Sequence, residues 1–281
     1  MAVHVIIGKG NLGLDLQDVL DTRKNTVHLW TRSEGFKWPE DVDKLRALKP
    51  DCVWITAGGG SVEHANTYAG LREIIDTHVY LPMSISQGIE DSTRLVVFSS
   101  DYVVDEGCTQ NPARQVRKPR SRYAYSKAWM EQGLTGFKRP WTSIVRVGSL
   151  YGMHYPERCL PGKIIMRNPT PTTLSLPCNF ITPTPTDWIA NKLVQHYDSG
   201  LFGKDGVLVH HCAPLGQVSV QGFGQRILGQ GNGYNVESKG WDDARPHYSN
   251  MGCSLGKPGS WWHDLWEERA PSFRDALASP R

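Results

Sequence analysis

The stretch VHVIIGKGNLGLDL, residues 3–16, decides the fold of this chain. It begins with an apolar run typical of a buried strand, passes through a G-x-G-x-x-G turn and ends in an amphipathic helical pattern. Such glycines allow a tight turn, a close approach of the backbone to a pyrophosphate and close packing of helix on strand, with the helix N-terminus facing the phosphates. A purely structural glycine turn is the alternative. We predict a dinucleotide-binding turn formed by Gly8, Gly10, Asn11, Leu12 and Gly13.

Outward from this turn, the first half of the chain alternates short apolar runs with helical patterns. The apolar runs after the first are TVHLW, DCVWITAG, RLVVFSS and WTSIVRVGSLYG. Apolar strands separated by helices indicate a parallel sheet covered on both faces. We therefore predict an α/β fold whose core, residues 1–150, is a Rossmann-type doubly wound parallel sheet that binds NAD(P).

Beyond Tyr151 the chain becomes rich in proline and glycine. The segment NPTPTTLSLPCNFITPTPTDW contains too many prolines for regular central strands. Helical patterns at DWIANKLVQHY and QVSVQGFGQRILGQ and a strand pattern at GVLVHHC follow. We predict that residues 151–281 form a small substrate-binding lobe that is not independent, since some of its segments return to the core. The cleft between the two parts is the expected ligand site.

The composition is that of an ordinary soluble protein, with 39% hydrophobic and 21% charged residues. No apolar run approaches the ~18 residues that a membrane span requires. The N-terminus runs straight into a strand, without a basic leader or a small-residue cleavage site. We therefore expect a cytoplasmic protein with no membrane partner.

The net charge and the positions of the cysteines limit the expected binding partners further. A formal net charge of +3 does not indicate a nucleic-acid partner. The six cysteines contain no CxxC pair, and His210 and His211 have no third ligand at suitable spacing, so we predict no metal. The sequence leaves open whether the protein forms a homodimer. A basic cluster that is either an anion-attracting patch or a solvated loop comprises Arg114, Arg117, Lys118, Arg120 and Arg122.

The end of the second apolar run bears on the choice of cofactor. NAD-binding proteins usually keep an acidic residue here for the ribose hydroxyls, about 20 residues after the glycine turn. This chain instead offers Thr31, Arg32 and Ser33, and a guanidinium with hydroxyls suits a 2′-phosphate. NADP(H) is therefore favoured over NAD(H), although Glu34 lies nearby. The other cofactor contacts that we predict are Ala57, Gly58 and Lys127.

Candidate catalytic residues follow at the end of the fourth apolar run. RLVVFSSDYVVDEG brings Ser100 to the carboxyl edge of the sheet, where the nicotinamide would lie. The next helical segment, RYAYSKAW, places Tyr123 and Lys127 four residues apart on one face, whereas Tyr125 points elsewhere. Such a pair is common by chance. The order of glycine turn, serine and tyrosine–lysine pair is much rarer, and it favours a catalytic role.

The chemistry requires these residue types. A free tyrosine has a pKa of about 10, which makes it a poor acid–base group at neutral pH. A nearby ammonium, together with a nicotinamide cation, favours the phenolate and moves that pKa toward the working range. We expect Lys127 to do this while binding the nicotinamide ribose. Ser100 would hold the substrate carbonyl while Tyr123 protonates its oxygen as hydride reaches the carbon.

These motifs resemble those of the extended short-chain dehydrogenase/reductases, and most closely those of the dTDP-4-dehydrorhamnose reductase family. GKGNLG is similar to that family's glycine turn, though one residue tighter between the first two glycines. KPDCVWITAGG resembles its third strand, SSDYVVDEG its serine/threonine motif, and YAYSK its tyrosine–lysine motif. RVGSLYG resembles the next strand, and ARPHYSNM with WWHDLW resembles the end of the family's chain. The resemblance spans nearly the whole sequence.

The resemblance implies NADPH-dependent reduction of the 4-keto group of a nucleotide-linked 6-deoxy sugar. The chain departs from the family pattern at Ser149, where an aromatic is usual, in the basic cluster, and at AGGGSVEHAN after the third strand. His154 is a further candidate for the substrate lobe. The substrate contacts that we predict are Asp101, Tyr102, Arg167, Asn179 and Arg245.

Two other functions would use the same features. An epimerase or dehydratase would return the hydride to the sugar, but dehydratases usually follow the serine or threonine with an acid pair, and Tyr102 stands where the second acid would be. The spacing of Cys108 does not match that of the epimerising relatives. The second alternative is a non-catalytic regulatory subunit that binds NADP(H), because such a subunit is similar to the same family. Retention of the serine, tyrosine and lysine favours a catalyst.

Overall fold

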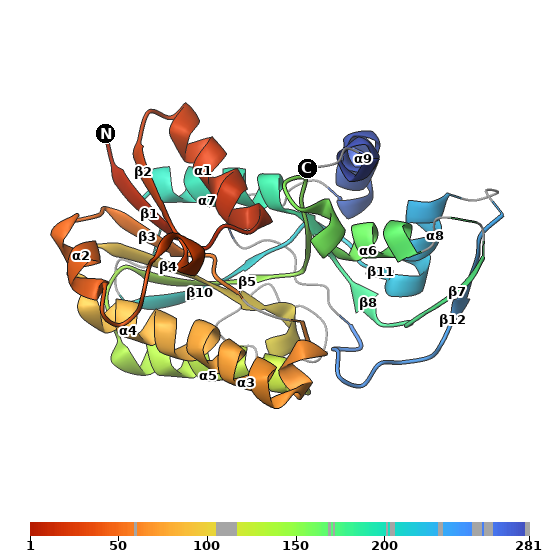
Figure 1. Cartoon of the computed structure of the whole chain (residues 1–281), viewed down its shortest axis with the longest axis horizontal. Coiled ribbons are helices and arrows are strands. Elements are labelled where there is room, and N and C mark those ends of the chain that lie inside the picture. Colours follow the sequence, from red (N-terminus) through yellow and green to blue (C-terminus); the bar gives the residue numbers. More distant parts are fainter. Residues whose placement is uncertain are drawn as a thin grey trace.

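A computed structural model describes residues 1–58, 61–104, 117–167, 170, 172–200, 202, 206–229, 233–248, 255 and 261–278. Its centre is a parallel sheet of six strands in the order β10-β5-β4-β3-β1-β2 (Figure 1). The strands are β1 (Val3–Ile7), β2 (Thr26–Trp30), β3 (Cys52–Ile55), β4 (Arg94–Ser100), β5 (Thr142–Val147) and β10 (Val207–Cys212). The doubly wound parallel fold predicted from the sequence is confirmed.

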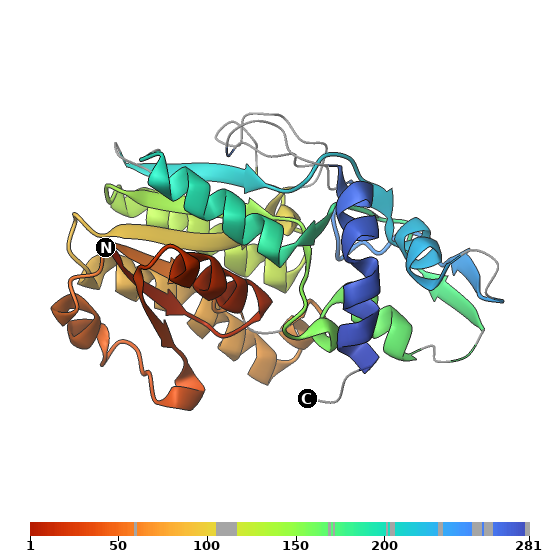
Figure 2. The ribbon, with the colours of Figure 1, turned by 90° about the horizontal axis from the view of Figure 1, so that it is seen from above.

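Helices cover both faces of this sheet (Figures 1 and 2). One face carries α1 (Asn11–Thr22) and α7 (Thr186–Asp198). The other carries α2 (Val42–Ala47), α3 (Tyr68–Ile75), α4 (Leu81–Gly88) and α5 (Arg122–Phe137), and a π-helical turn at Asp76–Tyr80 joins α3 to α4. Successive residues of β1 point to opposite faces, so Ile6 packs with α1 and α7 while Val5 and Ile7 pack with α4 and α5. This burial on both sides explains the unbroken apolar runs.

The remaining elements form a lobe to one side of the sheet (Figure 1). Its helices are α6 (Leu160–Arg167), α8 (Val220–Leu228) and α9 (Trp262–Ala278). Three two-stranded sheets complete it: β6 (Ser149–Tyr151) with β9 (Pro183–Pro185), β8 (Phe180–Ile181) with β11 (Val218–Ser219), and β7 (Thr173–Leu176) with β12 (Asn235–Ser238). The lobe has its own apolar core, in which Tyr151, Phe223 and Trp266 pack edge to face.

The chain crosses between core and lobe more than once. The described part of the proline-rich segment contributes the short strands β7, β8 and β9, which pair outside the central sheet. After it, α7 packs beside α1, and β10 pairs in parallel with β5 at the edge of the sheet. The run WTSIVRVGSLYG divides into β5 and β6 at Gly148, where an added Cβ would lie 2.6 Å from the Thr182 carbonyl oxygen. Among the described residues, no helix combines the length and apolar character that crossing a bilayer requires.

Candidate active site

The glycine turn joins β1 to α1, and its glycines serve different purposes. Gly8 has a φ of +122°, and a Cβ there would lie 2.5 Å from the backbone nitrogen of Ala57. A Cβ on Gly13 would lie 2.1 Å from the carbonyl oxygen of Gly8. The packing of the protein itself therefore requires these two glycines. Gly10 differs, because it has a φ of −88° and a Cβ there would meet no atom within 4 Å.

Gly10 is also the N-cap of α1, where it contributes no side-chain hydrogen bond. The first N–H groups of a helix have no partner within the helix and favour an anion. Open space in front of an uncapped helix N-terminus is what a diphosphate needs in order to approach the backbone. The residues at this turn thus fit a dinucleotide.

A cavity of about 510 Å³ extends from this turn along the ends of β1, β2 and β3. Predicted cofactor residues that line it are Gly8, Gly10, Thr31, Arg32, Ser33, Ala57 and Gly58. Leu12 lies instead in the apolar core beneath the turn. Sequence reasoning missed the aromatic part of the lining, to which Trp30, Phe36 and Trp38 contribute, and it also missed Arg158. Short-range patterns identified the glycines and the end of the second strand, but not residues that arrive from elsewhere.

The end of β2 forms a small charged network. The Thr31 hydroxyl accepts a hydrogen bond from the Glu34 backbone N–H at 3.1 Å and caps the 3₁₀ turn that follows. The Glu34 carboxylate receives hydrogen bonds from Lys9 and from Thr31, each at 3.0 Å, and these hold the pKa of Glu34 below its usual range. Arg32 pairs with Glu73 of α3 at 2.9 Å and lies over the Trp38 ring. The acid near this site is therefore already engaged by a lysine.

Asn11, a predicted cofactor residue, turns its side chain toward the C-terminal half of the chain. Its amide oxygen accepts from the Tyr155 backbone N–H at 2.6 Å, and its amide nitrogen donates to the Tyr155 carbonyl at 3.1 Å. The same nitrogen lies 3.2 Å from the Cys159 sulfur. The side chain of Asn11 thus holds a loop in place, and it is the backbone of this residue that belongs to the helix N-terminus.

Ser100 lies at the carboxyl end of β4, as its place after a buried apolar run predicts. Its hydroxyl donates to Asp101 Oδ1 at 2.9 Å and accepts from the Tyr102 backbone N–H at 3.2 Å. Asp101 is only 2% exposed. These contacts start the 3₁₀ turn Asp101–Val103 and fix the direction of the serine hydroxyl.

Tyr123 and Lys127 lie on the face of α5 that packs toward β4. The Lys127 ammonium donates to the Phe98 carbonyl at 2.9 Å and is 6% exposed. The ring of Tyr123 stands edge-on to those of His78 and Tyr102, with centroids 5.3 and 5.8 Å away. Tyr125 is 61% exposed, so it points into solvent as the helical spacing predicts.

Burial shifts the proton affinities of this pair in opposite senses. It raises the pKa of Tyr123 to about 12, with the nearby Asp101 carboxylate adding to the effect and a hydrogen bond with Ser100 opposing it. It lowers the pKa of Lys127 to about 8, while the negative charge of Glu131 opposes the change. Tyr123 is therefore a protonated phenol at neutral pH, and Lys127 holds its proton only moderately. In the protein by itself, burial and Asp101 raise the Tyr123 pKa, which differs from the lowering expected from Lys127.

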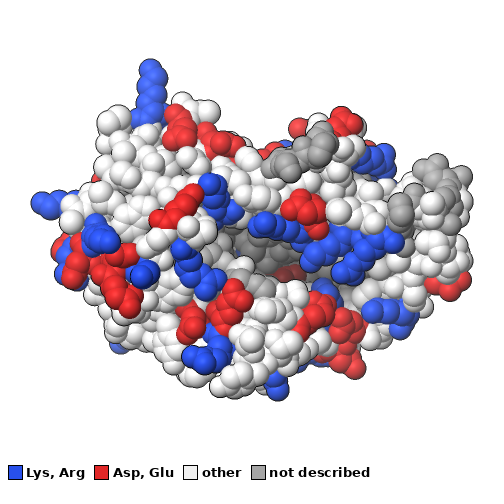
Figure 3. All heavy atoms as spheres, viewed as in Figure 1, with Lys and Arg blue, Asp and Glu red and all other residues white. Residues whose placement is uncertain are grey.

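A second cavity, of about 700 Å³, lies between the core and the lobe, where Figure 3 shows basic side chains gathered along a hollow. Ser100 and Tyr123 line it together with the predicted substrate residues Asp101, Tyr102, Arg167 and Arg245, and with Ser149. Lys163, one turn before Arg167 on α6, and Lys239 also line it. Sequence reasoning missed both lysines, although Lys163 and Arg167 share a spacing that places them on one helix face.

Arg245 links the lobe to the core across this cavity. Its guanidinium donates to the Tyr102 hydroxyl, to Asp242 at 2.9 Å and, at 3.4 Å, to Glu63 on the core side. Asn179 lies elsewhere than predicted: it is 1% exposed, and its amide binds the backbone of Asp242 and Pro246. Asn179 therefore holds the segment that carries Arg245, and it does not line the cavity.

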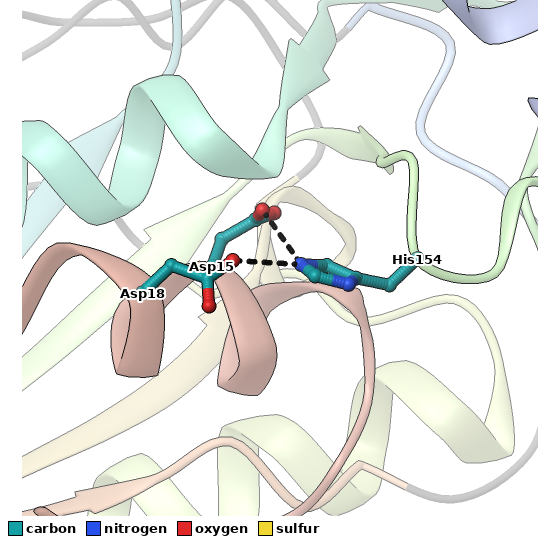
Figure 4. A group of neighbouring side chains, drawn as sticks. All are labelled: Asp15, Asp18 and His154. Carbon is teal, nitrogen blue, oxygen red and sulfur yellow. Dashed lines mark ion pairs between the residues drawn. The ribbon is translucent and has the colours of Figure 1, made fainter. Parts of the chain in front are cut away.

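His154 also lies away from the substrate cavity, against α1 (Figure 4). Its Nε2 is 3.2 Å from a carboxylate oxygen of Asp15 and 3.3 Å from one of Asp18. One ligand atom from each of the three residues lies within 4.8 Å of the others. The two aspartates share a helix face at i, i+3, but no sequence pattern pairs them with a histidine so far along the chain.

The other singled-out residues have structural contacts. Arg117 of the basic cluster pairs with the buried Glu131 at 2.7 Å, and Arg122 donates to the Asn66 carbonyl. His211 lies beside Arg146 on the neighbouring strand. Arg114 and Cys108 lie outside the described residues.

Solved structures of similar fold support this arrangement of core and lobe. A dTDP-4-dehydrorhamnose reductase from Clostridium acetobutylicum is 20% identical, with a TM-score of 0.82 over 99% of this chain and 100% of that one. One from Bacillus anthracis in complex with NADP is 16% identical, with a TM-score of 0.80 over the full length of both chains. DesIV, a dTDP-glucose 4,6-dehydratase from Streptomyces venezuelae with NAD and TYD bound, is 16% identical, with a TM-score of 0.78 over 97% of each chain. No curated protein sequence matches this chain.

A glycine turn, a serine closing the fourth strand, and a tyrosine and lysine one turn apart on the next helix define the class of extended short-chain dehydrogenase/reductases, which are NAD(P)-dependent oxidoreductases. Within this class, the sequence model described as RmlD substrate binding domain matches residues 1–273. The chain belongs to this family.

Proposed function

We propose that this protein is an NADPH-dependent reductase of a nucleotide-linked 4-keto-6-deoxy sugar, similar to dTDP-4-dehydrorhamnose reductase. The observation that carries the proposal is that Ser100 and Tyr123 line one cavity with Lys163, Arg167 and Lys239. A keto sugar needs a proton donor beside its carbonyl, and its diphosphate needs cations. One cavity offers both.

The side chains divide the chemistry among them. The Ser100 hydroxyl is positioned by the Tyr102 backbone N–H, and on substrate binding it would turn its single proton from Asp101 to the substrate oxygen. Tyr123, a phenol with a pKa raised to about 12, donates the proton to that oxygen. Lys127 then stabilises the phenolate through its positive charge. A bound nicotinamide would supply the hydride, and for this its ring would have to lie beside Ser100 and Tyr123.

The substrate diphosphate would lie along α6. Lys163 and Arg167 follow one another by a single turn on that helix and line the cavity, and Lys239 reaches it from the segment after β12. An arginine can bind a phosphate with two N–H groups, whereas a lysine acts as a point charge. Arg245 differs from these, because Asp242 and Glu63 already pair with it.

The network at the end of β2 supports the proposed preference for NADP(H). The Glu34 carboxylate is engaged by Lys9 and Thr31, and these contacts would compete with hydrogen bonds from a ribose 2′-hydroxyl. Arg32 has several N–H donors, of which Glu73 uses one, and Ser33 adds a hydroxyl at the same cavity. These groups suit a 2′-phosphate.

The direct test is NADPH oxidation by the purified protein with dTDP-linked and GDP-linked 4-keto-6-deoxyglucose, followed by the loss of NADPH absorbance. Substrate-dependent oxidation by either sugar supports the reductase and ranks the nucleotides. Tight NADPH binding without turnover on either would instead favour a regulatory subunit. Formation of an isomerised sugar without net NADPH loss would favour an epimerase.

A further inference from the structure

The loop after β6 folds back over the N-terminus of α1. Asn11 in the first turn of α1 exchanges two hydrogen bonds with the backbone of Tyr155, at 2.6 and 3.1 Å. At Gly152, where the loop begins, an added Cβ would lie 2.7 Å from the Cβ of Asn11. The backbone of the loop is therefore in direct contact with the helix end that the glycine turn presents.

A second contact holds the same loop along α1 (Figure 4). His154 lies within 3.2 Å of Asp15 and 3.3 Å of Asp18, which are respectively one turn and nearly two turns further along the helix than Asn11. The attachments at His154 and Tyr155 lie immediately before the backbone that follows and fix where it starts. That backbone is the 3₁₀ turn Pro156–Arg158.

This placement brings Arg158 to the dinucleotide cavity, whose wall it shares with Gly8, Lys9 and Gly10. The Arg158 guanidinium lies 4.1 Å from the centre of the Tyr155 ring, which supports its stem without neutralising its charge. Arg158 forms an ion pair with the neighbouring Glu157 at 3.5 Å, and the two side chains are 67% and 43% exposed. Such an exposed pair is weak and can be exchanged for a phosphate.

A diphosphate bound at the glycine turn would need a positively charged side chain beside it. A diphosphate brings about two negative charges, and the helix N-terminus supplies only about half a positive charge. Lys9 lies at the turn, but its ammonium is paired with Glu34 at 3.0 Å, a closer pair than the 3.5 Å between Arg158 and Glu157. Arg158 lines the same cavity, and its planar group can bind two phosphate oxygens at once.

We propose that Arg158, which comes from the segment beyond the core strands, binds the diphosphate of the dinucleotide at the glycine turn. The inference rests on the proposed function, because it takes the glycine turn to be the dinucleotide site. It assigns to Arg158 a different phosphate from that of Arg32, which lies at the end of β2. The two arginines should therefore respond differently to the removal of the 2′-phosphate.

The test measures equilibrium binding of NADPH, NADH and ADP to the wild-type protein and to Arg158→Gln, Arg32→Gln and Arg72→Gln. ADP carries the diphosphate but neither the nicotinamide nor the 2′-phosphate. We expect Arg158→Gln to weaken all three ligands by a similar factor of about ten. Arg32→Gln should weaken NADPH alone. Arg72 is an exposed arginine on α3, and its substitution controls for the loss of one positive charge.

The outcomes separate this inference from the function on which it rests. Unchanged affinities in Arg158→Gln, with a wild-type protein that binds NADPH, would overturn the inference and leave the proposed function standing. Weakening of NADPH alone would assign Arg158 to the 2′-phosphate and also overturn it. A wild-type protein that binds no dinucleotide would overturn both. Since the Arg158 side chain is 67% exposed, thermal unfolding should be unchanged in the variant, which excludes a loss of fold.

Discussion

The ammonium of Lys127 donates a hydrogen bond to the carbonyl oxygen of Phe98 at 2.9 Å, two residues before Ser100 on the same strand. This bond ties helix α5 to strand β4. Helix α5 carries Tyr123, the candidate proton donor, and strand β4 carries Ser100, the candidate hydrogen-bond partner of the substrate carbonyl. The bond therefore fixes these two elements relative to each other. A catalytic geometry built on a strand end and a helix face is more rigid than one built on loops.

Replacement of Tyr123 by Phe should lower the rate of substrate reduction by at least about a hundredfold, because the phenol is the proposed proton donor. NADPH affinity should be nearly unchanged, since the ring itself remains. Tyr125→Phe is the matched control on the same helix and should be close to silent, given that Tyr125 is 61% exposed. Steady-state kinetics with direct NADPH titration measures both effects. An essential Tyr125 and a dispensable Tyr123 would refute the assignment.

The two glycines Gly8 and Gly10 should separate folding from binding. Gly8→Ala should destabilise the protein by about 1 to 3 kcal/mol or more, because of its φ of +122° and the contact of its Cβ with Ala57. Gly10→Ala should leave stability unchanged or slightly higher, because its φ is −88° and its Cβ meets no protein atom within 4 Å. Dinucleotide binding should nevertheless fall in Gly10→Ala. Urea unfolding and NADPH titration measure the two properties, and full affinity in Gly10→Ala would argue against a diphosphate at this turn.

The buried carboxylate of Glu131 should be important for stability. It is 0% exposed and binds Arg146 through two hydrogen bonds of 2.8 Å, and Arg117 through a third of 2.7 Å. Glu131→Gln leaves the Arg146 guanidinium buried without its counter-charge, which costs about 3 to 5 kcal/mol in the free energy of unfolding.

The control for this variant is Glu267→Gln, which breaks the exposed pair with Arg226 and should change stability by less than about 1 kcal/mol. Both values come from urea denaturation. Similar effects of the two substitutions would mean that the buried network contributes no more than a surface pair.

Acid should destabilise the fold through buried histidines. Burial lowers the pKa of His4 and of His210 from 6.5 to about 4, so each stays neutral in the folded state where the unfolded chain would take up a proton. Their contribution to stability is fully present above pH 6.5 and is lost as pH falls toward 4. Each should cost on the order of 1 to 3 kcal/mol by that point.

The measurement is the free energy of unfolding as a function of pH. Between pH 8 and 7 these two histidines contribute no slope, which serves as an internal reference. His4 accepts a hydrogen bond from the Trp54 indole N–H at 3.2 Å, so Trp54 fluorescence reports on its surroundings. A flat stability curve from pH 7 to pH 4 would contradict the expectation.

The fold was predictable because local patterns determine it. The apolar runs of the core became strands, and the spacing correctly predicted that Tyr125 points away from the face that Tyr123 and Lys127 share. The sequence of a strand does not show which other strands will pair with it. The run GVLVHHC was correctly read as a strand, but its pairing with β5 in the central sheet depends on α7 packing beside α1.

The candidate site was predictable only where its residues follow one another closely. Ser100 follows its own strand, and Tyr123 with Lys127 form a short motif. Arg158 and Lys239 reach their cavities from distant segments, and no periodicity marks them. A polar residue type does not by itself predict a contact with a ligand. In the contacts described above, Asn179 binds only backbone groups of its own lobe.

The position of β10 has a consequence for how the chain is made. Strand β5 is buried between β4 and β10, yet β10 follows it by about sixty residues in the sequence. While a ribosome is still adding the intervening segment, the emerging chain presents β5 as an unpaired apolar edge. Such edges pair readily with other chains. We therefore expect the nascent protein to be prone to aggregation through this edge during that interval, and a chaperone that shields strand edges to reduce it.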